Sequence, residues 1–220
     1  MYALEVAREP ITLLAERALF IPRFSTLVVA DLHFGKSATF RARGVPIPAG
    51  VTQHDLERLT HAILATNATR LVVIGDLIHA KDGRSENTFR AISEWRNTHA
   101  SVEFTLVRGN HDIRAGDPPA EWNFRCADGP MLIGPFALQH HPGIHDTRYV
   151  LAGHLHPHAT VRGPARQSLR LPCFAFGKRG AILPAFTTFT GGGAYEQNED
   201  DELYVIADSE VLPARPMKRQ

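Results

Sequence analysis

The sequence predicts an α/β protein in which two mixed β-sheets pack against each other, flanked by helices. Up to residue 107, apolar β-branched runs alternate with helical patterns, which is the rhythm of a mainly parallel sheet with right-handed crossovers. After residue 113, short apolar runs are separated by Gly, Pro and Asp, and this pattern predicts a second sheet. No linker, internal repeat or change of composition divides the chain, so we expect a single domain over residues 1–220.

The first half of the chain alternates predicted strands and helices. Residues 11–21 predict a hairpin that turns at Glu16-Arg17, and residues 27–30 predict a buried strand. Residues 35–50 contain Gly, Pro and basic side chains, so we expect a loop with one helical turn at most. Thr52-Gln53-His54-Asp55 resembles a capping box and predicts a helix over 52–66. A strand at 71–74, a helix at 85–98 and a strand at 104–107 follow.

The second half predicts short strands and no helix. Strands are expected at 131–133, 136–138, 149–152, 169–171, 181–183 and 203–206. Residues 213–220 predict a loose tail.

Composition excludes several classes of protein. Hydrophobic residues make up 44% and charged residues 21%, which is typical of a soluble globular protein. The net charge of +1 provides no global basic field, although a local patch can still bind nucleic acid. Cys126 and Cys173 lie far apart without a Cys-x-x-Cys spacing, which argues against a zinc–thiolate site or a disulfide framework. No signal-peptide pattern or membrane-length apolar run is present, so we expect a cytoplasmic protein with no membrane partner.

Histidine is unevenly distributed along the chain. Of 12 His, seven fall between positions 111 and 158, and imidazole is the commonest metal-ligating side chain. This clustering indicates a metal site before any motif is considered. The seven are His111, His140, His141, His145, His154, His156 and His158.

Five short polar motifs each follow an apolar run. Ligands in open α/β sheets gather at the carboxyl ends of the strands, where these motifs are expected to lie. On an extended strand, Asp31 and His33 would share one face, and so would His154 and His156, with Leu155 pointing into the core. Oxygen and imidazole ligands without thiolates suit Mn, Fe or Zn. The motifs are Asp31-x-His33, Gly75-Asp76, Gly109-Asn110-His111-Asp112, His140-His141-Pro142 and Gly153-His154-Leu155-His156.

Taken in this order, the motifs resemble the calcineurin-like metallophosphoesterase superfamily over residues 31–156. The resemblance implies an αββα sandwich with a dinuclear metal centre. One metal would be held by Asp31, His33 and His156, the other by Asn110, a His of the fourth motif and His154, with Asp76 bridging. It further implies that a metal-bridging hydroxide attacks phosphorus, that His111 is the non-ligand general acid, and that Asp112 orients His111.

Further motifs resemble one bacterial branch of the superfamily, the ligase-associated DNA damage response endonucleases. In that branch the metal-binding His stands two residues before a Pro, which favours His140 over the adjacent His141 as the ligand. The resemblance implies a manganese-dependent phosphodiesterase that cleaves DNA, here expected in single-stranded form, with an ATP-dependent DNA ligase and a helicase as partners in DNA repair. Fe and Zn remain alternatives to Mn. The motifs are Asp31 to Lys36, Arg43 to Pro48, Gly75 to His79, Gly153 to Pro157, Leu183 to Phe186 and Thr190 to Gly192.

Candidate substrate-binding residues flank the first two motifs. Lys36 and Arg43 either grip a DNA phosphate or belong to an ordinary solvated loop. His79 either touches the substrate or is a surface His. Phe34 and Phe40 either stack on bases of a single strand or pack in the core. Two other functions stay open: a small-molecule or cyclic-nucleotide phosphodiesterase on the same scaffold, and a non-catalytic interaction module.

Overall fold

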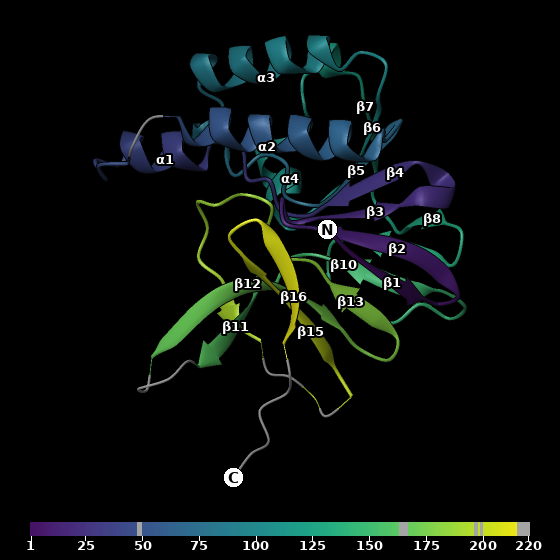
Figure 1. The fold of residues 1–220 in the computed structure, drawn as a ribbon. Helices are drawn as coiled ribbons and strands as arrows, with labels where there is room; N and C mark the ends of the chain where they lie inside the picture. Colours follow the sequence, from purple (N-terminus) through teal and green to yellow (C-terminus); the bar gives the residue numbers. More distant parts are fainter. Residues whose placement is uncertain (48–49, 163–166, 196–197, 199, 215–220) are drawn as a thin grey trace.

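A computed structural model describes residues 1–47, 50–162, 167–195, 198 and 200–214. It confirms the α/β class: two β-sheets pack against each other, and helices α2 and α3 lie on the outer side of the first sheet (Figure 1). Pro48, in one of the branch motifs, lies outside the described residues.

The first sheet has seven strands in the described part of the chain, and they lie in chain order. Neighbours from β1 to β4 are antiparallel, which confirms the predicted hairpin, and neighbours from β4 to β7 are parallel. The outermost strands, β1 and β7, were not predicted. The strands are β1 (Tyr2–Val6), β2 (Glu9–Leu14), β3 (Ala18–Ile21), β4 (Thr26–Val29), β5 (Arg70–Ile74), β6 (Glu103–Val107) and β7 (Phe124–Ala127).

The helices follow the predicted rhythm with two corrections and one addition, since α4 was not predicted. The segment expected to hold one helical turn forms α1, a seven-residue helix that packs on the 3-10 turn η2, a contact that the local sequence does not reveal. The predicted capping box at Thr52 is wrong, because α2 begins after Gly50 and the buried Asp55 carboxylate instead accepts the Thr187 hydroxyl at 2.7 Å. The helices are α1 (Lys36–Ala42), α2 (Val51–Thr66), α3 (Glu86–Thr98) and α4 (Asn110–Ala115), with 3-10 turns η1 (Pro22–Phe24), η2 (Lys81–Gly83) and η3 (Ala120–Trp122).

The second sheet has nine strands among the described residues. Its path is β14-β11-β12-β13-β10-β9-β8, and the β15–β16 hairpin adds to β12. All the predicted strands are present, whereas β11, β14 and β16 were not predicted. Strand β16 includes residues 213 and 214 of the predicted loose tail, and residues 215–220 lie outside the described residues. The strands are β8 (Met131–Ile133), β9 (Phe136–Gln139), β10 (Tyr149–Ala152), β11 (Pro157–Arg162), β12 (Ser168–Phe176), β13 (Gly180–Ile182), β14 (Gly193–Ala194), β15 (Glu202–Ala207) and β16 (Glu210–Ala214).

Three buried clusters correspond to the layers. Leu59 of α2 and Ile92 of α3 belong to the cluster on the outer face of the first sheet. Val28 and Phe174 belong to the cluster between the sheets, which contains residues of both and supports our proposal of one domain. A smaller cluster around Cys173 lies on the second sheet, where the described part of the chain places no α-helix after α4. None of the described helices has the length and apolar character needed to cross a bilayer.

The topology brings the ends of five strands together. Strands β4, β5 and β6 are parallel neighbours in the first sheet, and β9 and β10 are parallel neighbours in the second. Their carboxyl ends meet where Ala30 pairs with Ala185 and where the Gly153 N–H donates to the His140 carbonyl at 3.0 Å. The segments after these five strands carry the polar motifs.

Candidate active site

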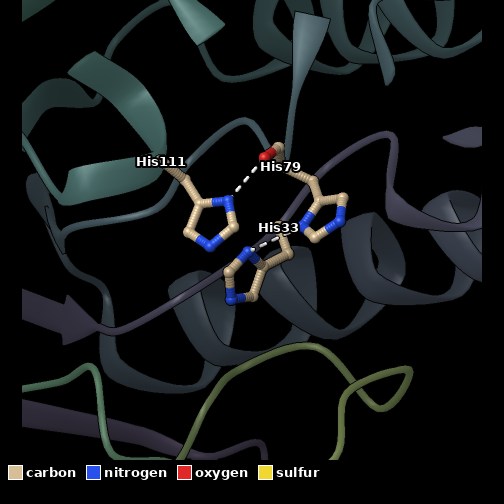
Figure 2. A group of neighbouring side chains, drawn as sticks. All are labelled: His33, His79 and His111. Carbon is tan, nitrogen blue, oxygen red and sulfur yellow. Dashed lines mark hydrogen bonds between the residues drawn. The ribbon is translucent and has the colours of Figure 1, made fainter. Parts of the chain in front are cut away.

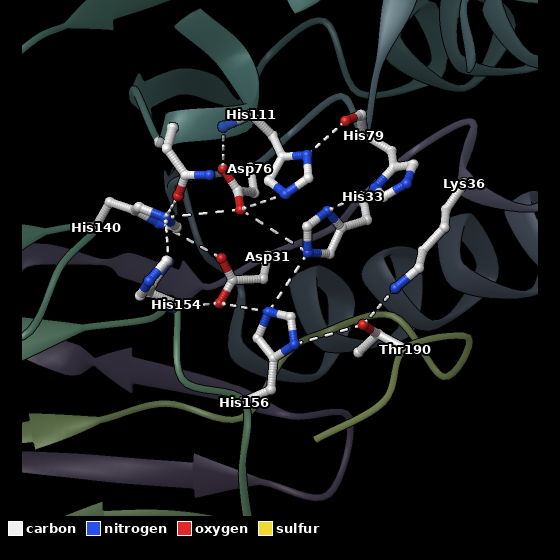
Figure 3. Close-up of polar contacts among 12 residues, drawn as sticks. Asp31, His33, Lys36, Asp76, His79, His111, His140, His154, His156 and Thr190 are labelled. Carbon is white, nitrogen blue, oxygen red and sulfur yellow. Dashed lines mark hydrogen bonds and ion pairs between the residues drawn. The ribbon is translucent and has the colours of Figure 1, made fainter. Parts of the chain in front are cut away.

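The five polar motifs converge on one cluster of side chains (Figure 3). Asp31 and His33 follow β4, and Asp76 follows β5. Asn110 and His111 are the first residues of α4, directly after β6 and its turn. The second sheet supplies the remaining three residues, which are His140 after β9 and His154 and His156 after β10.

The backbone that presents the paired motifs is left-handed rather than extended. Asp31 (φ 54°), His33 (φ 47°), His154 (φ 70°) and His156 (φ 47°) all have positive φ, which is uncommon outside glycine. We expected these side chains to share one face of an extended strand, and this explanation of their convergence is wrong. Leu155 shows the consequence, since it was expected in the core and is 46% exposed. Strain of this kind clusters at functional sites.

Two buried carboxylates form the centre of the site. Asp31 is 0% and Asp76 is 2% exposed. Each uses one oxygen to accept a backbone N–H from another motif: His154 donates to Asp31 Oδ2 at 2.8 Å, and His111 donates to Asp76 Oδ1 at 2.9 Å. Asp31 Oδ1 is a buried oxygen for which the described residues provide no hydrogen-bond donor. An uncompensated buried carboxylate is costly unless a cation joins it.

Imidazole nitrogens surround the other oxygen of Asp76. Its Oδ2 lies 3.6 Å from His140 Nε2 and 3.9 Å from both His33 Nε2 and His111 Nε2. These distances are long for hydrogen bonds. They match the spacing of metal ligands, because two ligand atoms that each lie about 2.1 Å from one ion are about 3 to 4 Å apart. On the adjacent side, His156 Nε2 lies 3.5 Å from Asp31 Oδ2 and 3.4 Å from His33 Nε2. Asp31, His33 and His156 thus form a group able to hold a metal ion.

A second group forms around His140. Its Nε2 lies 3.0 Å from Asn110 Oδ1 and 3.1 Å from His154 Nδ1. The exposed His141 also approaches, with its ring centroid 4.3 Å from that of His154. The geometry favours His140 over His141, because His140 is 3% exposed and is the one that reaches both Asp31 and Asp76.

Burial sets the protonation of these groups. Desolvation, followed by the charge of Asp76, raises the pKa of Asp31 well above its ordinary value of 3.8. Desolvation lowers the pKa of His140 to about 4 and also lowers the pKa of His33 and of His156. The imidazoles are therefore neutral at pH 7, which is the form that binds metal. The His156 Nδ1–H donates to the Gly191 carbonyl at 3.1 Å, leaving its Nε2 lone pair facing the cluster.

The residues present fit divalent cations. The candidate ligands are carboxylate, amide and imidazole groups, and Asp31 Oδ1 has no hydrogen-bond donor among the described residues. The backbone also leaves room for these donors to approach closely. A Cβ on Gly75 (φ 89°) would stand 1.8 Å from His140 Nδ1, and one on Gly109 would stand 2.3 Å from Asp76 Oδ1.

His111 lies beside these groups and pairs with His79 (Figure 2). The His111 Nδ1–H donates to the His79 carbonyl at 2.6 Å, and the two rings stack with centroids 5.0 Å apart. The His79 ring also lies edge-on to His33 at 5.3 Å, so His79 belongs to the site rather than to the open surface. Desolvation, with the charge of Lys36 nearby, lowers the pKa of His79 to about 4.

Asp112 does not orient His111 directly, contrary to the sequence prediction. Its carboxylate is buried and accepts two backbone N–H groups, from Gly109 at 2.9 Å and from Ile78 at 3.2 Å. It therefore fixes the start of α4 and the segment after β5. Burial raises the pKa of Asp112 to about 6.

The predicted phosphate-gripping residues differ in their surroundings. Lys36 is half-buried, and its Nζ donates to Thr190 Oγ1 at 2.6 Å, which in turn lies 3.4 Å from His156 Nδ1. Arg43 is exposed and lies 3.8 Å from the exposed Asp82. Lys36 is therefore joined to the metal-binding groups, whereas Arg43 has no such contact among those described.

Sequence reasoning missed two contributors to the site. The His79 carbonyl holds His111, but a backbone acceptor leaves no signal in side-chain identity. Phe189 packs against Phe40 with ring centroids 5.7 Å apart, a contact between residues too distant in the chain for any local pattern to reveal. Phe34, by contrast, is 4% exposed and packs in the core.

Comparisons with known proteins identify the family. The profile of the calcineurin-like phosphoesterases matches residues 24–134, or 111 of the 220 residues. A nuclease MPE from Pseudomonas putida is 37% identical with a TM-score of 0.85, and the similarity covers 97% of this chain and 99% of that one.

More distant structures are similar only in part. A protein of unknown function, AQ665 from Aquifex aeolicus, is 17% identical with a TM-score of 0.42, covering 60% of this chain and 78% of that one. The phosphoesterase Yfce from E. coli is 14% identical with a TM-score of 0.41, covering 84% and 95%. A search of curated proteins finds no match. The profile match and the Pseudomonas relative identify the family: this chain belongs to the calcineurin-like phosphoesterases and is a metal-dependent phosphoesterase.

Proposed function

We propose that this protein is a nuclease that hydrolyses phosphodiester bonds of single-stranded DNA with two divalent cations. The observation that carries the proposal is the pair of buried carboxylates, Asp31 and Asp76. Each has one oxygen that accepts a backbone N–H, and each lies 3.5 to 3.9 Å from imidazole nitrogens. The similarity to a Pseudomonas putida nuclease over nearly the whole chain supports a nucleic-acid substrate.

The ligands divide into two sets around Asp76. Asp31, His33 and His156 would hold one cation, and Asn110, His140 and His154 the other, with Asp76 shared. Bound cations supply a nucleophilic water at neutral pH and neutralise charge on the phosphoryl oxygens. Mn is the metal favoured by the motif resemblance, and Fe and Zn accept the same donors.

His111 is the proposed general acid. Its Nδ1–H is fixed on the His79 carbonyl, so that Nε2 faces the side of the cluster where Asp76 Oδ2 lies at 3.9 Å. Stacking on the His79 ring restricts rotation of the imidazole. A proton on Nε2 can then pass to the leaving oxygen as the ester bond breaks, a contribution on the order of 10²–10⁴-fold. Asp112 acts on this geometry only through the backbone, by fixing the start of α4.

The proposed biological setting has less support than the proposed reaction. A role in DNA repair, with an ATP-dependent ligase and a helicase as partners in the cytoplasm, rests on the motif resemblance alone. Lys36 is the proposed contact for a neighbouring phosphate, because its Nζ lies beside Thr190 at the edge of the metal-binding groups.

The proposal can be tested with the purified full-length chain. We expect single-stranded DNA to be cleaved with Mn²⁺ and not after chelation, and cleavage to be lost in Asp76→Ala and His111→Ala. Duplex DNA and cyclic nucleotides serve as competing substrates in the same assay, and a marked preference for cyclic nucleotides would replace the nuclease assignment. Metal analysis of the purified protein adds a further arm, since the absence of bound metal under every condition would favour a non-catalytic module.

A further inference from the structure

We infer that a base of the DNA strand, next to the cleaved bond, stacks on an aromatic ledge formed by Phe40 and Phe189. This inference rests on the proposed nuclease function and names a part of the substrate that the site recognises. The two rings come from α1 and from the segment after β13, and they meet edge to face with centroids 5.7 Å apart and an interplanar angle of 86°.

The aromatic ledge borders an open hollow. Its volume is about 330 Å³, which lies at the small end of the roughly 300–1000 Å³ range of ligand sites and suits a unit of nucleotide size. Both rings are half-buried, so part of each remains available to a ligand. The hollow is lined by Lys36, Phe40, Thr188, Phe189, Thr190 and Gly191.

The hollow adjoins the metal-binding groups through a short chain of contacts (Figure 3). Lys36 Nζ donates to Thr190 Oγ1 at 2.6 Å, and Thr190 Oγ1 lies 3.4 Å from His156 Nδ1. The other nitrogen of His156 faces Asp31. A strand whose phosphodiester lies over the metal-binding groups can therefore place the next nucleoside in the hollow, with Lys36 beside the phosphate that joins them.

The chemistry of the hollow selects a base of a single strand. Two aromatic rings form its wall, one cation stands at its edge, and none of the described residues that line it is acidic. Aromatic side chains combined with basic groups are the usual platform for unpaired bases, and stacking tolerates any base because each has a π-face. A base within a duplex has both faces covered by its neighbours and cannot stack on Phe189 without leaving the helix.

Hydrogen bonds from the half-buried Arg17 and to the buried Asp55 hold the segment that carries Phe189. Arg17 donates to the carbonyls of Ala185 and Thr187 at 3.2 and 2.7 Å. The Thr187 hydroxyl donates to Asp55 at 2.7 Å, and the Phe189 N–H donates to Thr187 Oγ1 at 3.2 Å. A fixed segment loses little freedom on binding, so stacking on it contributes more to affinity.

The test uses DNA strands that each lack one base at a different position along the sequence. In the wild-type protein, we expect a single missing base beside the cleaved bond to lower kcat/KM about tenfold, a typical effect for stacking on one aromatic platform. In the double variant Phe40→Leu/Phe189→Leu, intact DNA should show the same tenfold loss, and removal of that base should add nothing. Phe189→Trp keeps an aromatic face and should retain the base dependence.

Controls separate the ledge from the chemistry. A base-free deoxyribose-phosphate strand should be cleaved equally by the wild type and the double variant. Phe24→Leu removes a half-buried ring that lies before β4, and it should leave every rate unchanged. Circular dichroism and metal content show whether the variants fold and keep their cations.

The outcomes are distinguishable. If DNA is cleaved but the missing base costs the same in the wild type and the double variant, the ledge is refuted and the nuclease function stands. If the wild type cleaves no strand, both proposals fail. Should the variants not fold, the wild type is irradiated with DNA that carries 5-iododeoxyuridine beside the cleaved bond, with Ca²⁺ in place of Mn²⁺. Cross-links at Phe40 or Phe189 support the ledge. If cross-links form at other residues and at neither of these two, the ledge is refuted.

Discussion

The floor and the rim of the active site are built on different principles. We use floor for the four proposed metal ligands that are at most 4% exposed and rim for the half-buried side chains around them. The floor contains carboxylates and imidazoles whose charges and lone pairs the described protein groups leave partly uncompensated. In the rim, by contrast, Lys36 donates to Thr190 and the His79 carbonyl holds His111. The floor is Asp31, His33, Asp76 and His140, and the rim includes Lys36, Phe40, His79, Phe189 and Thr190.

This difference assigns the hydrolytic chemistry to the floor and the recognition of the substrate to the rim. The buried carboxylates and imidazoles of the floor suit cations, and in a calcineurin-like phosphoesterase such cations serve phosphoester hydrolysis. The rim groups are hydrogen-bonded to protein partners and therefore form a surface of defined shape, which in our proposal distinguishes a DNA strand from a small ester. Changes in the floor should therefore abolish metal binding and activity together, whereas changes in the rim should reduce activity and leave the metal in place.

The largest effect is expected in the floor. Asp76→Ala removes the carboxylate shared by both ligand sets, so metal content should fall and activity should drop by more than about 10²-fold, beyond the loss seen for an outer partner of a ligand. Metal analysis and DNA cleavage measure the two effects. Asp128→Ala, which removes an exposed carboxylate, is the matched control and should change neither. Full metal retention by Asp76→Ala would break the distinction between floor and rim.

His111→Ala comes next, because it removes the proposed acid and no proposed ligand. The rate should fall about 10²–10⁴-fold with metal content unchanged. Substrates with better leaving groups sharpen the test: they need less protonation, so the variant should recover activity on them. Equal metal loss in His111→Ala and in Asn110→Ala would show that the division of labour at the start of α4 is wrong.

A smaller effect is expected for Lys36 in the rim. Lys36→Ala should weaken DNA binding by a similar factor for all sequences and lower the slope of log Kd against log salt by about one, as expected for one phosphate contact. Arg43→Ala should have less effect, since this exposed side chain pairs with Asp82 in high dielectric. The slopes come from binding measured at several salt concentrations, with the exposed Lys178→Ala as control. A larger change in slope for Arg43→Ala than for Lys36→Ala would reverse this order.

The smallest effect is expected on protein stability at Asp55, which holds the segment of the rim that carries Phe189 through Thr187. Burial raises the pKa of Asp55 above its ordinary value of 3.8. A carboxyl whose folded pKa is raised contributes stability that is fully present below its unfolded pKa and is lost as pH rises through the folded value. The unfolding free energy of the wild type minus that of Asp55→Asn should therefore decline as pH rises above 3.8. Denaturant melts of both proteins measure this difference, and a difference that increases with pH would contradict it.

Much of the site could be predicted from the order of the motifs. Asp31, Asp76 and Asn110 each follow a parallel strand, and the carboxyl ends of such strands meet, so residue identity and strand order suffice to bring them together. The predicted reason for the Asp31 and His33 pairing was wrong, because both residues are left-handed rather than extended. Backbone strain is held by surrounding contacts and leaves no local periodicity.

The errors in the fold have a related cause. Helix α1 was expected as a loop because Gly, Pro and basic residues dominate residues 35–50, but packing against η2 stabilises seven helical residues there. Strand β7 was missed because its partner in the sheet, β6, provides a support that the short segment Phe124–Ala127 does not show by itself. Tertiary contacts override weak local propensity in both places.

The sequence by itself determined a candidate set of metal ligands, because the ligand types and their places after apolar strands are local properties of the chain. The resemblance of its motifs to a known family indicated the class of chemistry. Only the tertiary structure decided which oxygen of each carboxylate accepts a backbone N–H, that a backbone carbonyl rather than Asp112 holds His111, and that Phe189 lies beside Phe40. These features depend on hydrogen bonds and packing between segments far apart in the chain. A residue's identity limits what it can contact, and the fold alone selects which of those contacts form.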